Sequence, residues 1–148
     1  YTNMEEFDLH EVVRSLQELY RSDENIEFIW RPLPYRIIIN ADKTQMNRLF
    51  TNLFANAVEA CEGRLCRIEV SEQMMEGRIR ISIRDNGEGI PEETQSRIFM
   101  PNFTTKSSGT GLGLAMCKGI VEQVKGKIWF ETKKGNGTTF HVELPLVD

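Results

Sequence analysis

The hydrophobic residues of this chain recur with two different periods, which separate predicted helices from predicted strands. Apolar side chains spaced three and four residues apart predict amphipathic helices, and apolar side chains that alternate with polar ones predict strands. The predicted helices span residues 9–21, 42–61 and 111–124, with a short helical turn near 92–98. The predicted strands span residues 7–9, 26–30, 36–40, 67–75, 78–85, 127–132 and 138–144. Strands packed under three helices indicate a single domain over residues 1–148, a two-layer α/β sandwich with a mixed sheet.

The predicted helix over residues 42–61 carries a polar stripe along one edge. Asp42 is expected to cap its N-terminus, and its apolar side chains would pack on the sheet. The stripe contains Gln45, Arg48, Asn52, Asn56 and Glu59. Asparagine is a poor residue for a helix interior, but its oxygen suits Mg²⁺, which at nucleotide sites takes its other ligands chiefly from phosphates and water. The stripe is therefore either part of a magnesium–nucleotide site or an ordinary solvated face.

The segment DNGEGIP begins where the predicted strand over residues 78–85 ends. Asp85 can accept a hydrogen bond from an exocyclic amine such as that of adenine. Gly87 and Gly89 lack side chains, so a flat base can approach the backbone there. The alternative is a tight turn in which these residues serve only the backbone conformation.

The segment TTKSSGTGLGLA, residues 104–115, places glycines before the last predicted helix. It lacks the GxxxxGK[ST] order of a P-loop, and no strand precedes its glycines as a dinucleotide fingerprint requires. Backbone N–H groups at a helix N-terminus bind phosphate oxygens, and Lys106 adds a cation. The segment therefore suits a phosphate group, with a surface loop as the alternative.

In this order, the three segments resemble the N box and the two glycine boxes of the catalytic ATP-binding domain of bacterial sensor histidine kinases. Phe99 and Phe103 are similar to the intervening F box. The resemblance covers residues 7–145 and implies the Bergerat ATP-binding fold shared with gyrase, Hsp90 and MutL, an α/β sandwich with a flexible ATP lid. The FTTK sequence before the glycines resembles the nitrogen-regulation type of sensor kinase.

The resemblance implies a pocket for ATP and Mg²⁺. Asn56 would be the magnesium ligand, Asn52 a neighbouring phosphate or metal-shell contact, and Lys106 the cation at the terminal phosphates, which makes these three the expected catalytic residues. Asp85 would bind the adenine amine. The other expected nucleotide contacts are Glu59, Gly87, Gly89, Gly109, Thr110, Gly111, Leu112, Gly113 and, in the polar floor under adenine, Thr139.

One position favours a kinase over a hydrolase. In the gyrase and Hsp90 branch, a glutamate one helical turn before the metal-binding asparagine acts as the general base that polarises water. Asn52 stands at that position here, and an amide cannot take a proton at neutral pH. The resemblance therefore implies phosphoryl transfer to another nucleophile, with catalysis by positioning and charge neutralisation.

The chain itself offers no convincing phosphoacceptor. His10 lacks the Arg and Pro that follow an H box, and His141 lies within the last predicted strand. Because the sequence begins at Tyr1 rather than at a methionine, we expect a longer, homodimeric protein with its acceptor histidine on an upstream dimerisation domain. A response regulator would be the next recipient of the phosphoryl group. The isolated domain is expected to be a monomer.

Composition narrows the remaining classes. A net charge of −4 argues against a nucleic-acid partner, and no apolar run approaches the roughly 18 residues of a membrane span. Cys61, Cys66 and Cys117 lack metal-ligand spacing and are interpreted as buried free thiols, which predicts a cytoplasmic domain. The alternatives left open are a serine kinase of the anti-sigma-factor type, a gyrase-like or MutL-like hydrolase, and a non-catalytic nucleotide sensor.

Overall fold

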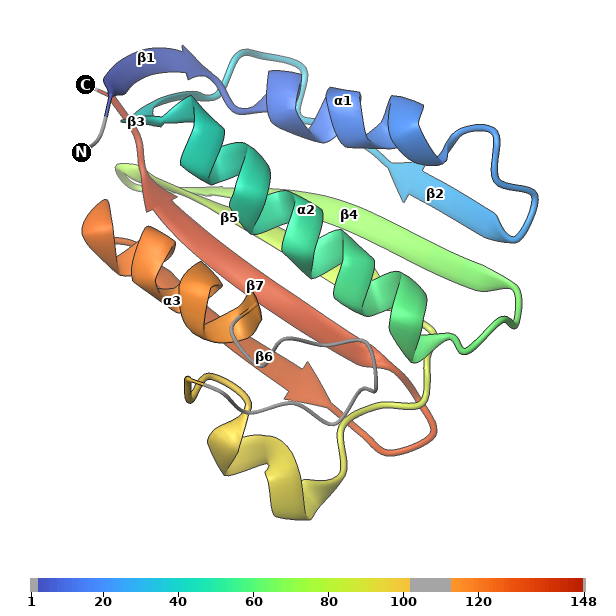
Figure 1. Ribbon diagram of the computed structural model, residues 1–148. Helices are drawn as coiled ribbons and strands as arrows, with labels where there is room; N and C mark the ends of the chain where they lie inside the picture. The colour runs from blue at the N-terminus through green and yellow to red at the C-terminus, as the bar shows by residue number, and fades with distance from the viewer. Residues whose placement is uncertain (1–2, 102–112, 148) are drawn as a thin grey trace.

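The computed structural model describes residues 3–101 and 113–147, which form two layers (Figure 1). Helices α1 (His10–Tyr20), α2 (Lys43–Ala60) and α3 (Gly113–Gln123) all cover one face of a five-stranded sheet. The strands are β1 (Met4–Asp8), β2 (Ile26–Trp30), β3 (Ile38–Asp42), β4 (Cys66–Met75), β5 (Arg78–Asp85), β6 (Lys127–Thr132) and β7 (Thr138–Pro145). A 3-10 helix, η1, spans Glu92–Arg97. The predicted sandwich of a mixed sheet under three helices is confirmed.

The large sheet has the strand order β2-β4-β5-β7-β6, in which β2 runs parallel to β4 and the other pairs are antiparallel. β1 pairs with β3 in a separate two-stranded sheet. The strands β2 and β3, which the sequence predicts on either side of one turn, therefore belong to different sheets. Pro32 and Pro34 in their connection lack the backbone donors that a hairpin ladder uses.

Helix α2 crosses the middle of the sheet and supplies much of the core. Asp42 caps it as predicted, since its carboxylate accepts hydrogen bonds from the backbone N–H groups of Thr44 at 3.0 Å and Gln45 at 3.3 Å. The buried face of α2 consists of Met46, Leu49, Phe50, Leu53, Phe54 and Ala57. Burial of this face on the sheet turns the polar stripe of α2 toward α3, which lies beside it (Figure 1).

The cysteines differ from the expectation. Cys61 and Cys66 are joined by a disulfide, with their Cα atoms 5.6 Å apart, because the short connection from α2 to β4 brings them together. The prediction of three free thiols is therefore wrong for this pair. Cys117 is a buried free thiol, and desolvation raises its pKa to about 12. Among residues 3–101 and 113–147, no helix has the length and apolar content needed to cross a membrane.

Candidate nucleotide-binding site

The polar stripe of α2 forms one wall of the candidate site. Asn52 Nδ2 donates a hydrogen bond to the backbone oxygen of Arg48 at 2.9 Å, which fixes the orientation of the amide. Its Oδ1 then lies at the N-terminus of α3, where a Cβ atom added to Gly113 would be 3.6 Å away. Asn56 is half-buried one turn further along α2, and Glu59 is exposed in the last turn. The structure therefore brings together the predicted residues Asn52 and Gly113, with Asn56 one turn away on the same helix.

Asp85 ends β5 on the face of the sheet that the helices cover. Its side chain is buried, with the residue only 4% exposed, and its Oδ1 accepts the N–H of Gly87 at 2.8 Å. A carboxylate can accept several hydrogen bonds, so its position at a strand end beside a turn suits a ligand that brings an N–H group. An adenine amine is such a ligand.

The glycines after Asp85 have a packing role that the sequence alone does not reveal. A Cβ at Gly87 would lie 2.6 Å from the backbone oxygen of Ala60, at the end of α2. Gly89 has a φ of +81°, and a Cβ there would lie 2.5 Å from the backbone oxygen of Lys133. The loop after β5 is thus wedged between the end of α2 and the β6–β7 turn, and neither contact leaves room for a side chain.

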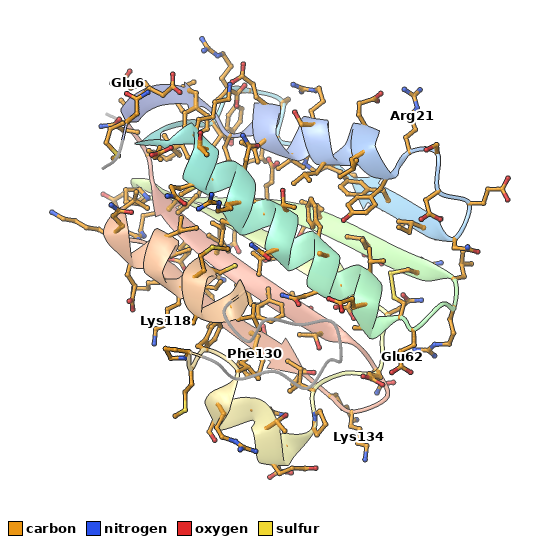
Figure 2. All side chains as sticks on the ribbon, viewed as in Figure 1. Glu6, Arg21, Glu62, Lys118, Phe130 and Lys134 are labelled. Atoms are coloured by element: carbon orange, nitrogen blue, oxygen red, sulfur yellow. A yellow bond between two sulfur atoms is a disulfide. The ribbon has the colours of Figure 1, made fainter. Side chains whose placement is uncertain are left out.

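Backbone hydrogen bonds hold the same loop on both sides. The N–H of Glu88 donates to the oxygen of Ala60 at 3.1 Å, and the N–H of Gly135 donates to the oxygen of Glu88 at 2.6 Å. Figure 2 shows Glu62, just beyond α2, and Lys134, in the β6–β7 turn, at the same end of the molecule. These links join three segments that are distant in sequence, so motif spacing does not predict them.

Thr139 does not lie with Asp85, which corrects the expected adenine floor. Residues of β7 alternate between the two faces, and the register pairs Thr139 with Arg84. Thr138, 5% exposed, precedes Thr139 and shares its face with the buried Phe140, which pairs with Ile83 of β5. The polar residue beside Asp85 is therefore Thr138. The sequence has a threonine at both positions, so only the strand register shows which of the two lies on the face of Asp85.

Several predicted contacts fall outside the described residues. They are Lys106, Gly109, Thr110, Gly111 and Leu112, together with Phe103 of the F box. Phe99 of the same box is described, and its ring packs against those of Phe130 and Phe140 with centroids 6.0 and 6.4 Å apart. Figure 2 labels Phe130, which β6 presents on the side of the sheet that carries the helices.

Both histidines of the chain are held away from this site. His10 begins α1, beyond α2 from α3 (Figure 1), and its Nε2 lies 2.8 Å from Oε1 of Glu72. His141 lies on the helix-free face, where its Nδ1 is 2.7 Å from Ser82 Oγ and its Nε2 is 2.6 Å from Glu131 Oε1. Hydrogen bonds occupy both ring nitrogens of His141, so neither histidine is placed to accept a phosphoryl group from a nucleotide beside Asn56.

The donor set fits magnesium bound together with a nucleotide. No group of three or more acidic, histidine or cysteine side chains able to hold a metal ion occurs in the part of the chain that the structure describes. A neutral amide oxygen beside a glycine-rich helix start is nevertheless a suitable single protein ligand, because Mg²⁺ in nucleotide sites takes its remaining ligands from phosphates and water. The narrow loop and buried carboxylate at the other end suit a base.

Comparisons with known proteins agree with this site. A family model described as histidine kinase-, DNA gyrase B-, and HSP90-like ATPase matches residues 41–148, and the chain belongs to this family. Membership implies that it binds ATP. The sensor histidine kinase ZraS of Klebsiella oxytoca is 37% identical over 143 residues, which cover 94% of this chain and 31% of that protein. The chain thus spans about a third of the length of this relative.

The solved structures narrow the class to histidine kinases. The catalytic domain of histidine kinase ThkA has a TM-score of 0.86 and 36% sequence identity, covering 97% of this chain and 96% of that one. ThkA in complex with the response regulator protein TrrA has a TM-score of 0.81 and 34% identity, covering 97% of this chain and 42% of that one. The chain has the fold of a histidine kinase catalytic domain.

Proposed function

We propose that this chain is the catalytic part of a sensor histidine kinase. In the whole protein it transfers the γ-phosphoryl group of magnesium-bound ATP to a histidine on a dimerisation domain of the same protein. The observation that carries this proposal is Asn52, whose amide faces the start of α3 from the position where a hydrolase of the family has its general base. An amide orients groups by hydrogen bonding but removes no proton from water.

The adenine end of the site binds through a buried acceptor. Asp85 accepts a hydrogen bond from the exocyclic amine, and the loop wedged between α2 and the β6–β7 turn holds that carboxylate in place. A preformed acceptor costs little ordering free energy when the base arrives, which favours tight binding.

The phosphate end is formed by α2 and the start of α3. Asn56 holds Mg²⁺, which when bound neutralises charge on the transferred phosphoryl group. Asn52 and the backbone of residues 109–113 orient the phosphates, and Lys106 pairs with the terminal ones. Phosphoryl transfer needs chiefly positioning and charge stabilisation, so this set is sufficient without a proton-abstracting residue.

The proposed partners are the domain that carries the phosphoacceptor histidine and the protein that next receives the phosphoryl group. Both histidines of this chain make hydrogen bonds elsewhere, so the acceptor lies on another domain of a longer, homodimeric protein. A response regulator receives the phosphoryl group next, a proposal supported by the ThkA–TrrA complex. The domain works in the cytoplasm, where ATP and such regulators occur, and the isolated domain is a monomer.

The test is transfer of label between separate proteins. The purified chain is mixed with Mg²⁺, ATP labelled in its γ-phosphate and the dimerisation domain of the parent protein, with Asn56→Ala as the inactive control. We expect label on the dimerisation domain in an acid-labile, base-stable form, which is typical of phosphohistidine. Acid-stable label on a serine, or release of free phosphate at the same rate with and without the dimerisation domain, would refute the proposal.

A further inference from the structure

The hydroxyl of Thr132, the last residue of β6, joins three parts of the adenine end. It accepts the N–H of Ile90 at 2.9 Å, and it lies 2.8 Å from the hydroxyl oxygen of Thr138 and 3.1 Å from the backbone oxygen of Gly137. Ile90 belongs to the loop that follows Asp85, and its N–H lies outside any strand ladder. A single side chain of β6 therefore bridges this loop and the start of β7.

Counting donors and acceptors fixes the hydrogen bond to Ile90 and leaves the other two open. A threonine hydroxyl has one proton to donate and two lone pairs to accept. The N–H of Ile90 can only donate, so Thr132 accepts there. The proton of Thr132 points either to the backbone oxygen of Gly137, which also receives the N–H of Lys133 at 3.3 Å, or to the hydroxyl oxygen of Thr138. In both arrangements the hydroxyl of Thr132 holds Ile90.

The hold on Ile90 matters because the loop that contains Ile90 begins directly after Asp85. The Asp85 carboxylate accepts from the exocyclic amine of adenine, whereas the carbonyl oxygen at the same position of guanine offers no donor. The carboxylate therefore favours adenine as long as the loop holds it in place, and a guanine oxygen would face it without a donor.

We propose that Thr132 is a positioning residue for nucleotide selection, although it lies one layer behind the base. Its hydroxyl holds Ile90, and with it the loop after Asp85, and it links that loop to Thr138. The same end is already tightly docked, since the N–H of Gly135 donates to Glu88 at 2.6 Å. The inference rests on the proposed function, because it concerns how the ATP site distinguishes its base.

The experiment compares variants that differ by one hydroxyl. Thr132→Val removes the hydroxyl at nearly constant volume, Thr132→Ser restores it, and Thr139→Val is the matched control on the opposite face of the sheet. Calorimetry measures the dissociation constants of each protein for ATP and for GTP in the presence of Mg²⁺. Amide hydrogen exchange at Ile90 reports whether the loop remains held.

We expect Thr132→Val to bind ATP about fivefold to tenfold more weakly, the scale of one lost hydrogen bond, with little change for GTP. The preference of the protein for ATP over GTP then falls by the same factor. Exchange at Ile90 becomes about tenfold faster, since its acceptor is gone. Thr132→Ser and Thr139→Val keep the wild-type ratio and exchange rate. A general loss of stability would weaken both nucleotides alike and leave the ratio unchanged.

Two results would overturn the inference while leaving the proposed function intact. One is a Thr132→Val protein with the wild-type ATP-to-GTP ratio, and the other is a Thr132→Ser protein that behaves like the valine variant. If the wild-type chain binds no ATP, the proposed function fails and this inference fails with it. Thr132→Ala, which removes the hydroxyl together with the γ-methyl group, replaces the valine variant if that protein does not fold.

Discussion

The two faces of β5 and β7 carry polar residues in contrasting settings. On the helix-free face, His141 is hydrogen-bonded to Ser82 and Glu131, and its ring stacks on Trp129 with centroids 5.1 Å apart. On the covered face, Asp85 and Thr138 are 4% and 5% exposed beside the loops that end the strands. The first group is satisfied by its own side chains and faces solvent. The second lies in an enclosed setting, where electrostatic interactions are stronger.

The comparison teaches that short hydrogen bonds alone do not identify a functional site. The Ser82, His141 and Glu131 chain has the shorter contacts, at 2.7 and 2.6 Å, yet no described helix or loop encloses a ligand over it. Asp85 has a longer hydrogen bond, at 2.8 Å from the N–H of Gly87, but it lies at the end of a strand, against a glycine loop and near α2. Enclosure by other elements, and not polarity, distinguishes the two faces.

The largest effect is expected for Asn56→Ala. Loss of the magnesium ligand should lower phosphoryl transfer by about a hundredfold, the scale of losing one preorganised electrostatic contact in an active site. ATP binding should also lose its dependence on Mg²⁺, which titrations with and without the metal ion measure. Asn47→Ala is the matched control, because this exposed asparagine lies on the opposite side of α2. Transfer that still requires Mg²⁺ in Asn56→Ala would assign the metal to another ligand.

Asp85→Asn should have the next largest effect and tests the covered face. Replacing one carboxylate oxygen by an amide nitrogen removes a charged acceptor and should weaken ATP binding by about 1–3 kcal/mol. Calorimetry measures the change, with Glu131→Gln, which removes an exposed carboxylate on the helix-free face, as the control. Equal losses in the two variants would erase the distinction between the faces.

Much of the fold followed from periodicity, because each long element has a clear apolar face. The alternation around Ile79, Ile81 and Ile83 predicts β5, and the cap at Asp42 marks the start of α2. The placement of β3 with β1 could not be predicted in this way. Short apolar strands are compatible with several partners, and only the completed core selects one of them.

The candidate site was predictable where a motif and an element coincide. Asn52 and Asn56 share one helix edge, and Asp85 ends one strand, so local geometry places them. The choice between Thr138 and Thr139 depends on register between strands that are distant in sequence. The role of Thr132 depends on a contact with Ile90, 42 residues away. Long-range contacts of this kind leave no periodic signal in the chain.

The smallest effect is expected for Ser82→Ala on the helix-free face. The substitution leaves His141 Nδ1 without its partner at 2.7 Å, so urea unfolding should show a loss of about 1 kcal/mol in the free energy of unfolding. ATP affinity should not change. Ser71, exposed on β4 and paired in register with Ser82, provides the matched control, because Ser71→Ala should alter neither quantity. If Ser82→Ala weakened ATP binding as much as Asp85→Asn, the helix-free face would have to be counted as part of the nucleotide site.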